Sequence, residues 1–403
     1  MWSRQPQQER PPSYWSVVPQ EKTTAEIEAE RWAFVVPYAP GKYCLPLCTV
    51  QFRRWMLFLA AFVVQFCNGS LFAWSVLNQP IDNFIQGKAR DSVPPAKEMA
   101  VVTFYITAGV HGCATALFGP FVERHGPRHS LIVASSLFFV GHVVSFVSVY
   151  FKSYVGLYIG YGVFCGAGFG IAYIAPVSAL LKWFPDLRGT AGGFAVCGVG
   201  LGTAFWGRIY PFLIESLGTE CFFLVFGLLL CLILLISSCI LRTPPPNYVV
   251  GGRNVQGVKV TERRTQSVVS KQDDSTEERV SVVLGEVQRN NFFNVFDYQE
   301  LELGEAEILY HNKIKSLRIR ECVFSVDFVL LYLVFVGASV AGTNVMSRVY
   351  NIAASVYSHV EDDDLIQMVA TMSIANFFGQ VLCPLISDKY ITLAQLTQRL
   401  AAR

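Results

Sequence analysis

The chain has 403 residues, of which 52% are hydrophobic and 15% are charged, and its formal net charge is +2. Soluble chains carry about a quarter charged residues, so this composition leaves too few charges to coat a soluble protein of this length. The small net charge, with basic residues dispersed rather than gathered in one stripe, argues against a nucleic-acid partner.

Residues 1–52 are polar, charged and proline-containing, with no apolar core near the start, so they predict a cytosolic tail rather than a signal peptide. Cys44 and Cys48 lie close together ahead of the first apolar run, and zinc, a disulfide and palmitoylation all stay open for them. The other cysteines mostly lie singly inside apolar runs, as small core residues do. We therefore expect no cofactor and assign no metal ligands.

Eight apolar runs are long enough to cross the hydrocarbon core of a bilayer, which takes about 20 helical residues. Because no water satisfies backbone amides inside a bilayer, each run predicts a helix. The runs cover residues 55–80, 99–121, 130–150, 154–181, 190–214, 221–241, 326–347 and 365–387. The sequence thus predicts an all-α integral membrane protein that crosses the bilayer many times.

One long polar segment divides these runs. Residues 243–320 begin with "TPPPN" and carry mixed charges, which predicts a cytosolic linker that is partly disordered. Six runs precede it in residues 53–242, and two follow it in residues 321–403. We expect a complete N-terminal six-helix half and an incomplete C-terminal half.

The orientation follows from basic residues at the ends of the spans. With a cytosolic N-terminus, the basic residues beside the first, second and fourth spans all face the cytosol, as the positive-inside rule requires: Arg53, Arg54, Arg124, Arg128, Lys182 and Arg188. Lys88, Arg90 and Lys97, in the loop after the first span, argue the other way. We predict a multi-pass protein with a cytosolic N-terminus.

The fourth run invites a nucleotide-binding interpretation. Gly166, Gly168 and Gly170 match part of a G-x-G-x-x-G pattern, and Asp186 follows about twenty residues later, where a ribose partner belongs. That fingerprint needs a short buried strand before the glycines and a soluble helix after them, and the sequence predicts neither. Gly162, Gly166 and Gly170 instead recur every fourth residue, which predicts close packing between membrane helices.

Two segments six spans apart share a turn-forming residue followed by an acid and a base. Residues 119–128 read "GPFVERHGPR", and residues 384–389 read "PLISDK". This recurrence indicates two equivalent halves, the parallel repeat of a secondary transporter. An enzyme is not expected, because no nucleophile, base and orienting group occur together at recognisable spacing.

The first of these segments resembles the signature loop of the major facilitator superfamily. The stretch "GIAYIAPVSALLKWFPDLRGTAGGFAVCGVGLG" and the first-span "FAWSVLNQPI" resemble the oxalate/formate antiporter-like branch, with weaker similarity to monocarboxylate transporters. The resemblance covers about residues 53–242 and 322–390. It implies transport of a small organic anion, a monocarboxylate first of all, by alternating access between two bundles in the lipid bilayer, with proton coupling left open.

The resemblance also assigns roles to individual residues. It implies a conformational latch, for which an ordinary charged turn is the alternative, at Gly119, Glu123, Arg124, Gly126, Arg128, Asp388 and Lys389. Gln380 stands where relatives carry an arginine eight residues before the loop aspartate, which weakens a claim for oxalate and favours a singly charged substrate.

Polar residues within the spans are the candidates for a substrate cavity, although packing is the alternative for each: Gln65, Asn68, Trp74, His111, Tyr161, Tyr173, Asn344, Asn376 and Gln380. His111 is preferred to His142 as a proton carrier, with an interhelical hydrogen bond as the alternative. Arg208 and Arg348 lie towards the outer ends of their spans, where they either form an entrance for anions or snorkel to the interface.

After Lys389 the four further helices of the family do not follow, and "YITLAQLTQRLAAR" is too polar to span a bilayer. A truncated gene model, a degenerate product and a fragment that needs a partner all stay open. The alternative function is that of a non-transporting membrane relic, fragment or receptor-like scaffold derived from such a carrier.

Overall fold

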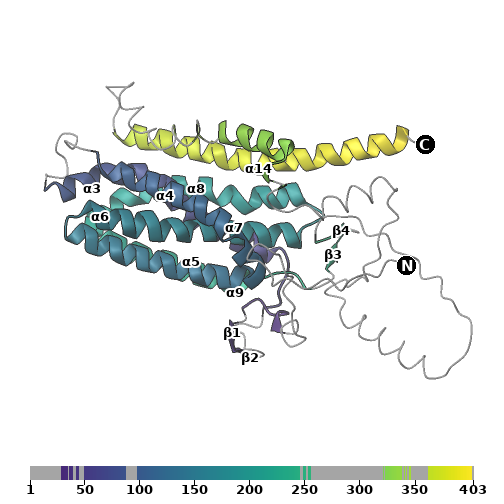
Figure 1. Ribbon diagram of the computed structural model, residues 1–403, viewed down its shortest axis with the longest axis horizontal. Helices are drawn as coiled ribbons and strands as arrows, with labels where there is room; N and C mark the ends of the chain where they lie inside the picture. The colour runs from purple at the N-terminus through teal and green to yellow at the C-terminus, as the bar shows by residue number, and fades with distance from the viewer. Residues whose placement is uncertain are drawn as a thin grey trace, which may run out of the picture.

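The computed structural model describes residues 29–34, 36–39, 42–44, 50–87, 98–245, 248–250, 253–255, 321, 323–337, 340, 342, 345 and 362–401. Most of this described part is helical, and the long helices run side by side (Figure 1). Six of the described helices are long and apolar enough to cross a membrane: Met56–Ile85, Ala100–Leu117, Gly119–Tyr150, Tyr154–Trp183, Thr219–Ile240 and Ala370–Tyr390.

The first bundle consists of six helical rods. Two of them change helix type along their length without ending. In chain order the elements are α2 (Met56–Phe72), the 3₁₀-helix η1 (Ala73–Leu77), α3 (Asn78–Ile85), α4 (Ala100–Leu117), α5 (Gly119–Tyr150), α6 (Tyr154–Leu157), the π-helix η2 (Tyr158–Cys165), α7 (Gly166–Trp183), α8 (Arg188–Leu217) and α9 (Thr219–Ile240).

Beyond the bundle the structure describes a helix at Val326–Gly337 and the long helix α14 (Asp362–Ala401). Two short antiparallel hairpins complete the described part: β1 (Val36–Ala39) with β2 (Lys42–Cys44), and β3 (Val249–Val250) with β4 (Arg253–Asn254). Cys48 and most of the linker predicted at 243–320 lie outside the described residues.

The predicted all-α membrane architecture is confirmed, with two differences in the spans. The span predicted at 190–214 is the helix α8, but its repeated glycines lower its hydropathy, so it is not among the six helices that are both long and apolar enough to cross a membrane. The span predicted at 326–347 is described as a continuous helix over Val326–Gly337, with further helical residues at 340, 342 and 345.

The charged segment between the second and third spans is not an open turn, as the sequence had suggested, but mostly helix. Helix α5 begins at Gly119, two residues after the end of α4. Backbone hydrogen bonds bridge the two helices, as from Val122 N to Phe118 O at 2.9 Å. The helix is interrupted at Gly126, whose φ of 76° favours glycine, and Pro127 follows. Gly126 therefore marks the kink between a short charged helix and the long span.

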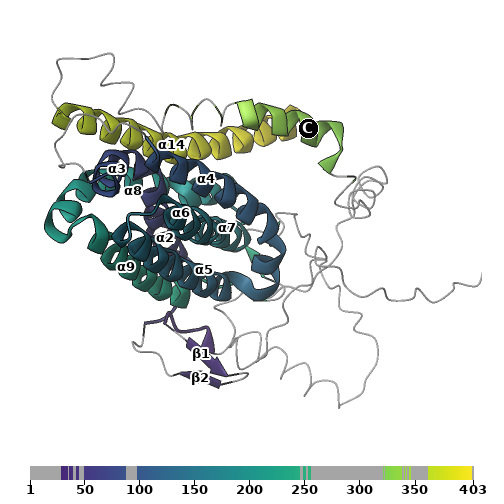
Figure 2. The same cartoon turned by 60° about the vertical axis from the view of Figure 1, so that its left-hand side comes forward.

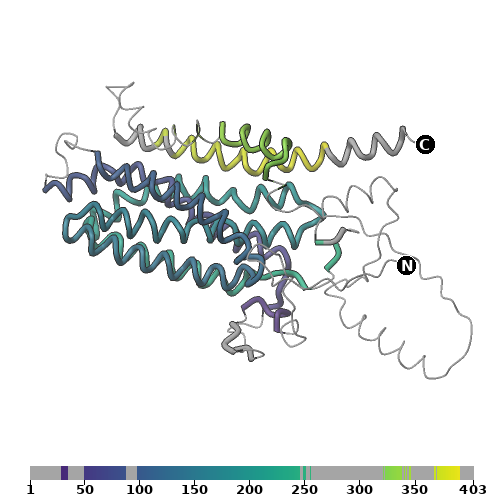
Figure 3. The backbone as a smooth tube through the Cα atoms, in the orientation of Figure 1, coloured from purple at the N-terminus to yellow at the C-terminus, as the bar shows by residue number. Residues whose placement is uncertain are grey.

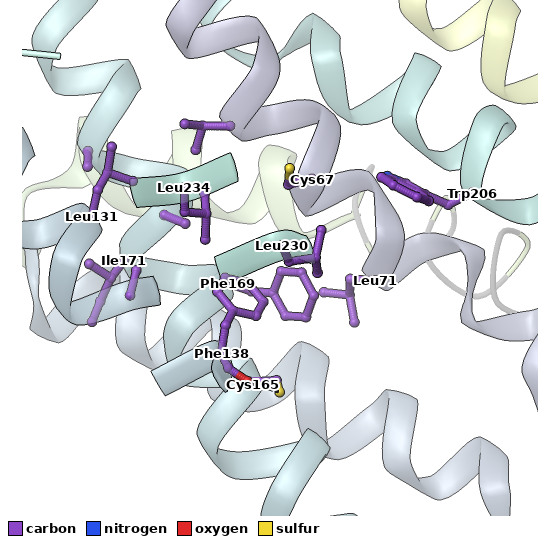
Figure 4. Packing of buried hydrophobic residues seen from close by; sticks show 14 of the residues in the cluster. Cys67, Leu71, Leu131, Phe138, Cys165, Phe169, Ile171, Trp206, Leu230 and Leu234 are labelled. Atoms are coloured by element: carbon purple, nitrogen blue, oxygen red, sulfur yellow. Dashed lines mark hydrogen bonds between the residues drawn. The ribbon is translucent and has the colours of Figure 1, made fainter. Parts of the chain in front are cut away.

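The core of the bundle lies where α2, α5, α7, α8 and α9 meet (Figure 4). Phe138 of α5 and Phe169 of α7 pack edge to face, with ring centroids 4.5 Å apart. The outer face of α9 exposes leucines three or four residues apart, including Leu224, Leu228 and Leu232. This division into a packed inner face and an apolar outer face suits helices surrounded by lipid.

The small-residue spacing in the fourth span has the structural role that the sequence predicted. A Cβ at Gly162 would lie 2.8 Å from Ile106 Cγ2, and one at Gly170 would lie 2.6 Å from the His111 carbonyl oxygen. Both contacts are to α4, so the glycines allow α4 and the fourth rod to approach closely. The packing interpretation is confirmed, and Asp186 binds Arg54 at 3.4 Å.

Helix α14 runs along α8 on one side of the bundle (Figures 1 and 2), and the backbone tube shows the same arrangement (Figure 3). Glycines make this contact possible. A Cβ at Gly200 would lie 2.9 Å from both Ser373 O and Phe377 N, so a side chain there would push the helices apart. The α8–α14 contact thus joins the first bundle to a helix that lies beyond the linker.

Candidate functional site

Three polar groups meet between α2 and α7 at the middle of the bundle. The fully buried Gln65 donates from Nε2 to the backbone oxygen of Tyr173 at 3.0 Å. Asn68, one turn further along α2, donates from Nδ2 to Gln65 Oε1 at 3.0 Å. The Asn68 Oδ1 atom is buried and has no hydrogen-bond partner among the described residues. The chain thus places an ordered polar cluster inside an apolar bundle.

His111 of α4 joins this cluster through Tyr173. The two rings meet edge to face, with centroids 5.5 Å apart. His111 Nδ1 is buried without a described hydrogen-bond partner. Four of the predicted cavity residues, Gln65, Asn68, His111 and Tyr173, therefore share one neighbourhood between α2, α4 and α7.

Trp74 and Tyr161 lie elsewhere, in an aromatic part of the core. Their ring centroids are 4.3 Å apart, and Trp74 donates to Ala100 O at 3.1 Å. His142 lies against Tyr161 and donates from Nδ1 to Phe138 O at 2.8 Å. These buried contacts are what the packing alternative predicted for residues of this type.

The cavity residues predicted on later helices are only partly described. Gln380 lies on the face of α14 that meets α8, since its backbone oxygen approaches Gly193, and its Oε1 is buried without a described partner. Asn376 is exposed. Asn344 and Arg348 lie outside the described residues.

The charged residues of the proposed latch gather at one end of the bundle. Glu123 of α5 pairs with Lys182 of α7 and accepts a hydrogen bond from Ser178 Oγ at 2.6 Å. Both partners belong to the first bundle, so Glu123 joins two of its helices. Arg124 is half-buried on the same helical turn.

The second copy of the acidic motif crosses from α14 to the start of α8. The Asp388 carboxylate accepts hydrogen bonds from Gly189 N at 3.2 Å, Thr190 N at 2.7 Å and Thr190 Oγ1 at 2.8 Å. A carboxylate at a helix N-terminus also gains from the helix dipole. Lys389 beside it is exposed.

A weaker polar contact lies near the other end of the same helix pair. Arg208 of α8 donates from Nη1 to Gln367 Oε1 on α14 at 3.2 Å, and both residues are exposed. The α8–α14 pair is therefore joined by polar groups at both ends and by close glycine contacts between them.

A protein-family model shows to which family the chain belongs. The family model of the Major Facilitator Superfamily matches residues 57–401. The chain belongs to this superfamily. It is accordingly a multi-pass integral membrane protein, and the resemblance drawn from the two acidic motifs is confirmed.

Two curated relatives in this superfamily fit the expected branch. The "Oxalate:formate antiporter" of Oxalobacter formigenes is 25% identical over 193 residues, covering 48% of this chain and 43% of the relative. "Monocarboxylate transporter 9" of Rattus norvegicus is 28% identical over 188 residues, covering 46% and 34%. The chain spans less than half the length of these two relatives.

Among solved structures, a D-xylose-proton symporter is similar with a TM-score of 0.42 and 16% sequence identity. The similarity covers 82% of this chain and 69% of the symporter.

One residue of this superfamily member escaped the sequence analysis. Arg242, which is 2% exposed, follows α9 and donates to the backbone oxygens of Glu30, Trp32, Ala33, Cys239 and Ile240. Its guanidinium also lies 4.0 Å from the ring centroid of Phe52. A single arginine thus fastens the segment before α2 to the end of the bundle.

Arg128, which was assigned to the latch, contacts two of the residues that Arg242 binds. Its Nη1 lies 3.9 Å from Glu30 Oε1, and its Nη2 donates to Cys239 O at 3.5 Å. Burial, followed by the Arg128 charge, lowers the pKa of Arg242, whereas Glu30 opposes this shift. The sequence around Arg242 gives no sign of this role, because three of its acceptors are backbone oxygens about 210 residues away.

Proposed function

We propose that this chain serves secondary active transport of a small organic anion by alternating access, with a monocarboxylate as the substrate class. Membership of the superfamily supports transport, and two relatives of this chain are named for an oxalate/formate pair and for monocarboxylates. Proton coupling would use the His111 neighbourhood, where an imidazole lies beside the polar cluster.

One observation carries the alternating-access part of the proposal. Asp388 reaches from α14 to the first turn of α8, so three hydrogen bonds to one carboxylate join the first bundle to α14 at this end. Alternating access requires contacts between bundles that break at one end while the packing elsewhere persists. Three hydrogen bonds to one carboxylate can break and form again, whereas the glycine contacts along the helices are suited to remain.

The proposed latch combines this contact with the Glu123–Lys182 pair. Glu123 sets the relative position of α5 and α7, and α8 begins a few residues after Lys182. A movement of the Glu123–Lys182 pair would therefore also displace the Asp388 contact at the start of α8. In the proposed orientation, with a cytosolic N-terminus, both lie at the cytosolic end of the bundle.

The proposal is tested by uptake into proteoliposomes that contain the purified full chain. Labelled formate, acetate and oxalate are supplied in turn, and protein-free vesicles give the background. We expect saturable uptake of the monocarboxylates that exceeds uptake of oxalate, and we expect Asp388→Asn to alter its rate. The absence of saturable uptake for every acid would refute the proposed function.

A further inference from the structure

The hydrogen bonds between α2 and α7 determine which way two amide side chains point. The backbone oxygen of Tyr173 can only accept, so Gln65 must present its Nε2 group there, at 3.0 Å. Gln65 therefore turns its Oε1 atom towards Asn68. Because that oxygen also only accepts, Asn68 must present Nδ2, again at 3.0 Å.

This chain of donors leaves the Asn68 Oδ1 atom as an acceptor that the amide cannot exchange for a donor. Asn68 is 2% exposed, and Oδ1 has no hydrogen-bond partner among the described residues. Buried polar atoms in native proteins are nearly always hydrogen-bonded, so an acceptor in this position calls for a donor from outside the described residues. A bare carboxylate offers only acceptors and does not meet this requirement.

We propose that Asn68 determines specificity by accepting an O–H group of the transported acid. This inference rests on the proposed function and adds the chemical group that the first bundle recognises. The O–H group has two sources, a hydroxyl beside the carboxylate or the protonated carboxyl itself. The position suits this role, since Gln65 fixes the amide from one side and the Tyr173–His111 pair extends the same polar neighbourhood.

Glycolate and acetate test the proposal because they differ only by a hydroxyl group. Their competition for uptake is measured with the full chain in proteoliposomes, at neutral and at mildly acidic pH. With a hydroxyl as the donor, we expect glycolate to be preferred about tenfold or more at neutral pH, since acetate leaves the Asn68 oxygen unpaired. With a protonated carboxyl as the donor, we expect acetate uptake to rise steeply as the pH falls.

Two variants and a control separate recognition from folding. Asn68→Leu removes the acceptor and should abolish whichever dependence the native chain shows. Gln65→Leu frees the Asn68 amide to rotate and present Nδ2, so preference should shift towards the bare carboxylate. Thr107→Val is the control, because the buried Thr107 hydroxyl donates only within its own helix, to Thr103 O at 2.6 Å, and its loss should leave the dependence unchanged.

Each outcome has one meaning. Loss of the hydroxyl preference or of the pH dependence in Asn68→Leu, with both retained in Thr107→Val, supports the proposal. Unchanged discrimination in both Asn68→Leu and Gln65→Leu would overturn the proposal and assign Oδ1 to an internal water. Absence of any acid uptake by the native chain would refute the proposed function, and this inference with it.

Discussion

Asp388 binds Thr190 through two different groups, the backbone N at 2.7 Å and the hydroxyl Oγ1 at 2.8 Å. Thr190 lies on α8, which precedes the long linker in the sequence, and Asp388 lies on α14, which follows it. Position, charge and helix polarity all favour the same contact, because the carboxylate meets the positive end of α8. This relationship makes Asp388 the first residue to change.

Asp388→Asn should weaken the closure of this end of the bundle. The amide keeps one acceptor oxygen but loses the charge, and hydrogen bonds to a charged group contribute about 1.5 to 3 kcal/mol. We expect a cysteine placed at Gly192 to react about tenfold faster with a membrane-permeant thiol reagent in this variant. Tyr390→Phe, at an exposed position nearby on α14, is the control and should have little effect. Equal labelling rates in Asp388→Asn and the native chain would exclude the latch.

Glu123→Lys should destabilise the first bundle and change the balance of inward and outward states. Both side chains of the Glu123–Lys182 pair are about a quarter exposed, at 29% and 25%, so the loss is screened and amounts to about 1 kcal/mol. The exchanged pair, Glu123→Lys with Lys182→Glu, should recover about half or more of the thermal stability that Glu123→Lys loses. Thermal unfolding in detergent of the native chain, the two single variants and the double variant measures this coupling. A double variant no more stable than Glu123→Lys would show that the pair does not act through charge.

The sequence was informative where one residue type determines the local structure. Long apolar runs predict helices because a bilayer leaves no other way to satisfy the backbone, and the spacing of Gly162, Gly166 and Gly170 predicts close helix packing. The charged segment after Gly119 was misjudged because charged residues at a helix end suggest a turn. Its backbone hydrogen bonds nevertheless continue as far as Gly126.

Arg242→Ala should release the segment that precedes α2. The alanine leaves five carbonyl oxygens without the guanidinium, and an unpaired buried acceptor costs about 1 to 3 kcal/mol. We expect faster trypsin cleavage after the exposed Arg31, together with a lower unfolding temperature in detergent. Arg242→Lys should be intermediate, because an ammonium group offers fewer donors in a less suitable geometry. Arg208→Ala is the control, since Arg208 lies at the other end of α8.

The same contact makes a prediction about topology. Because Arg242 holds Glu30 and Ala33, the N-terminal tail and the start of the linker must lie on one side of the membrane. An epitope at Met1 and another after Lys271 should both be inaccessible to antibody in intact cells and accessible after permeabilisation. Labelling of both in intact cells would reverse the proposed orientation, and labelling of one alone would contradict the Arg242 contact.

The site was less predictable than the fold because its geometry depends on partners far apart in the chain. Gln65 and Asn68 were identified as polar residues at membrane depth, but the direction of the Asn68 amide follows from the Tyr173 carbonyl, 108 residues from Gln65. Trp74 and Tyr161 also carry polar groups at membrane depth, but they lie in the aromatic core instead. Depth in a span identifies candidates, and only the packing of neighbouring helices distinguishes a polar cluster from a buried ring.

Gln380→Arg should shift the substrate preference from singly charged acids towards oxalate. Gln380 lies on the α8-facing side of α14, and its side-chain oxygen is buried without a described partner, so the position is available to a longer donor. A neutral amide supplies no charge to a second carboxylate, whereas a guanidinium binds a carboxylate with two parallel hydrogen bonds. We expect the ratio of oxalate to formate uptake to rise about tenfold, a difference of about 1.4 kcal/mol. Gln380→Met keeps the length without charge and should lower uptake of both acids alike. An unchanged ratio in the arginine variant, with protein of normal stability, would remove Gln380 from the substrate site.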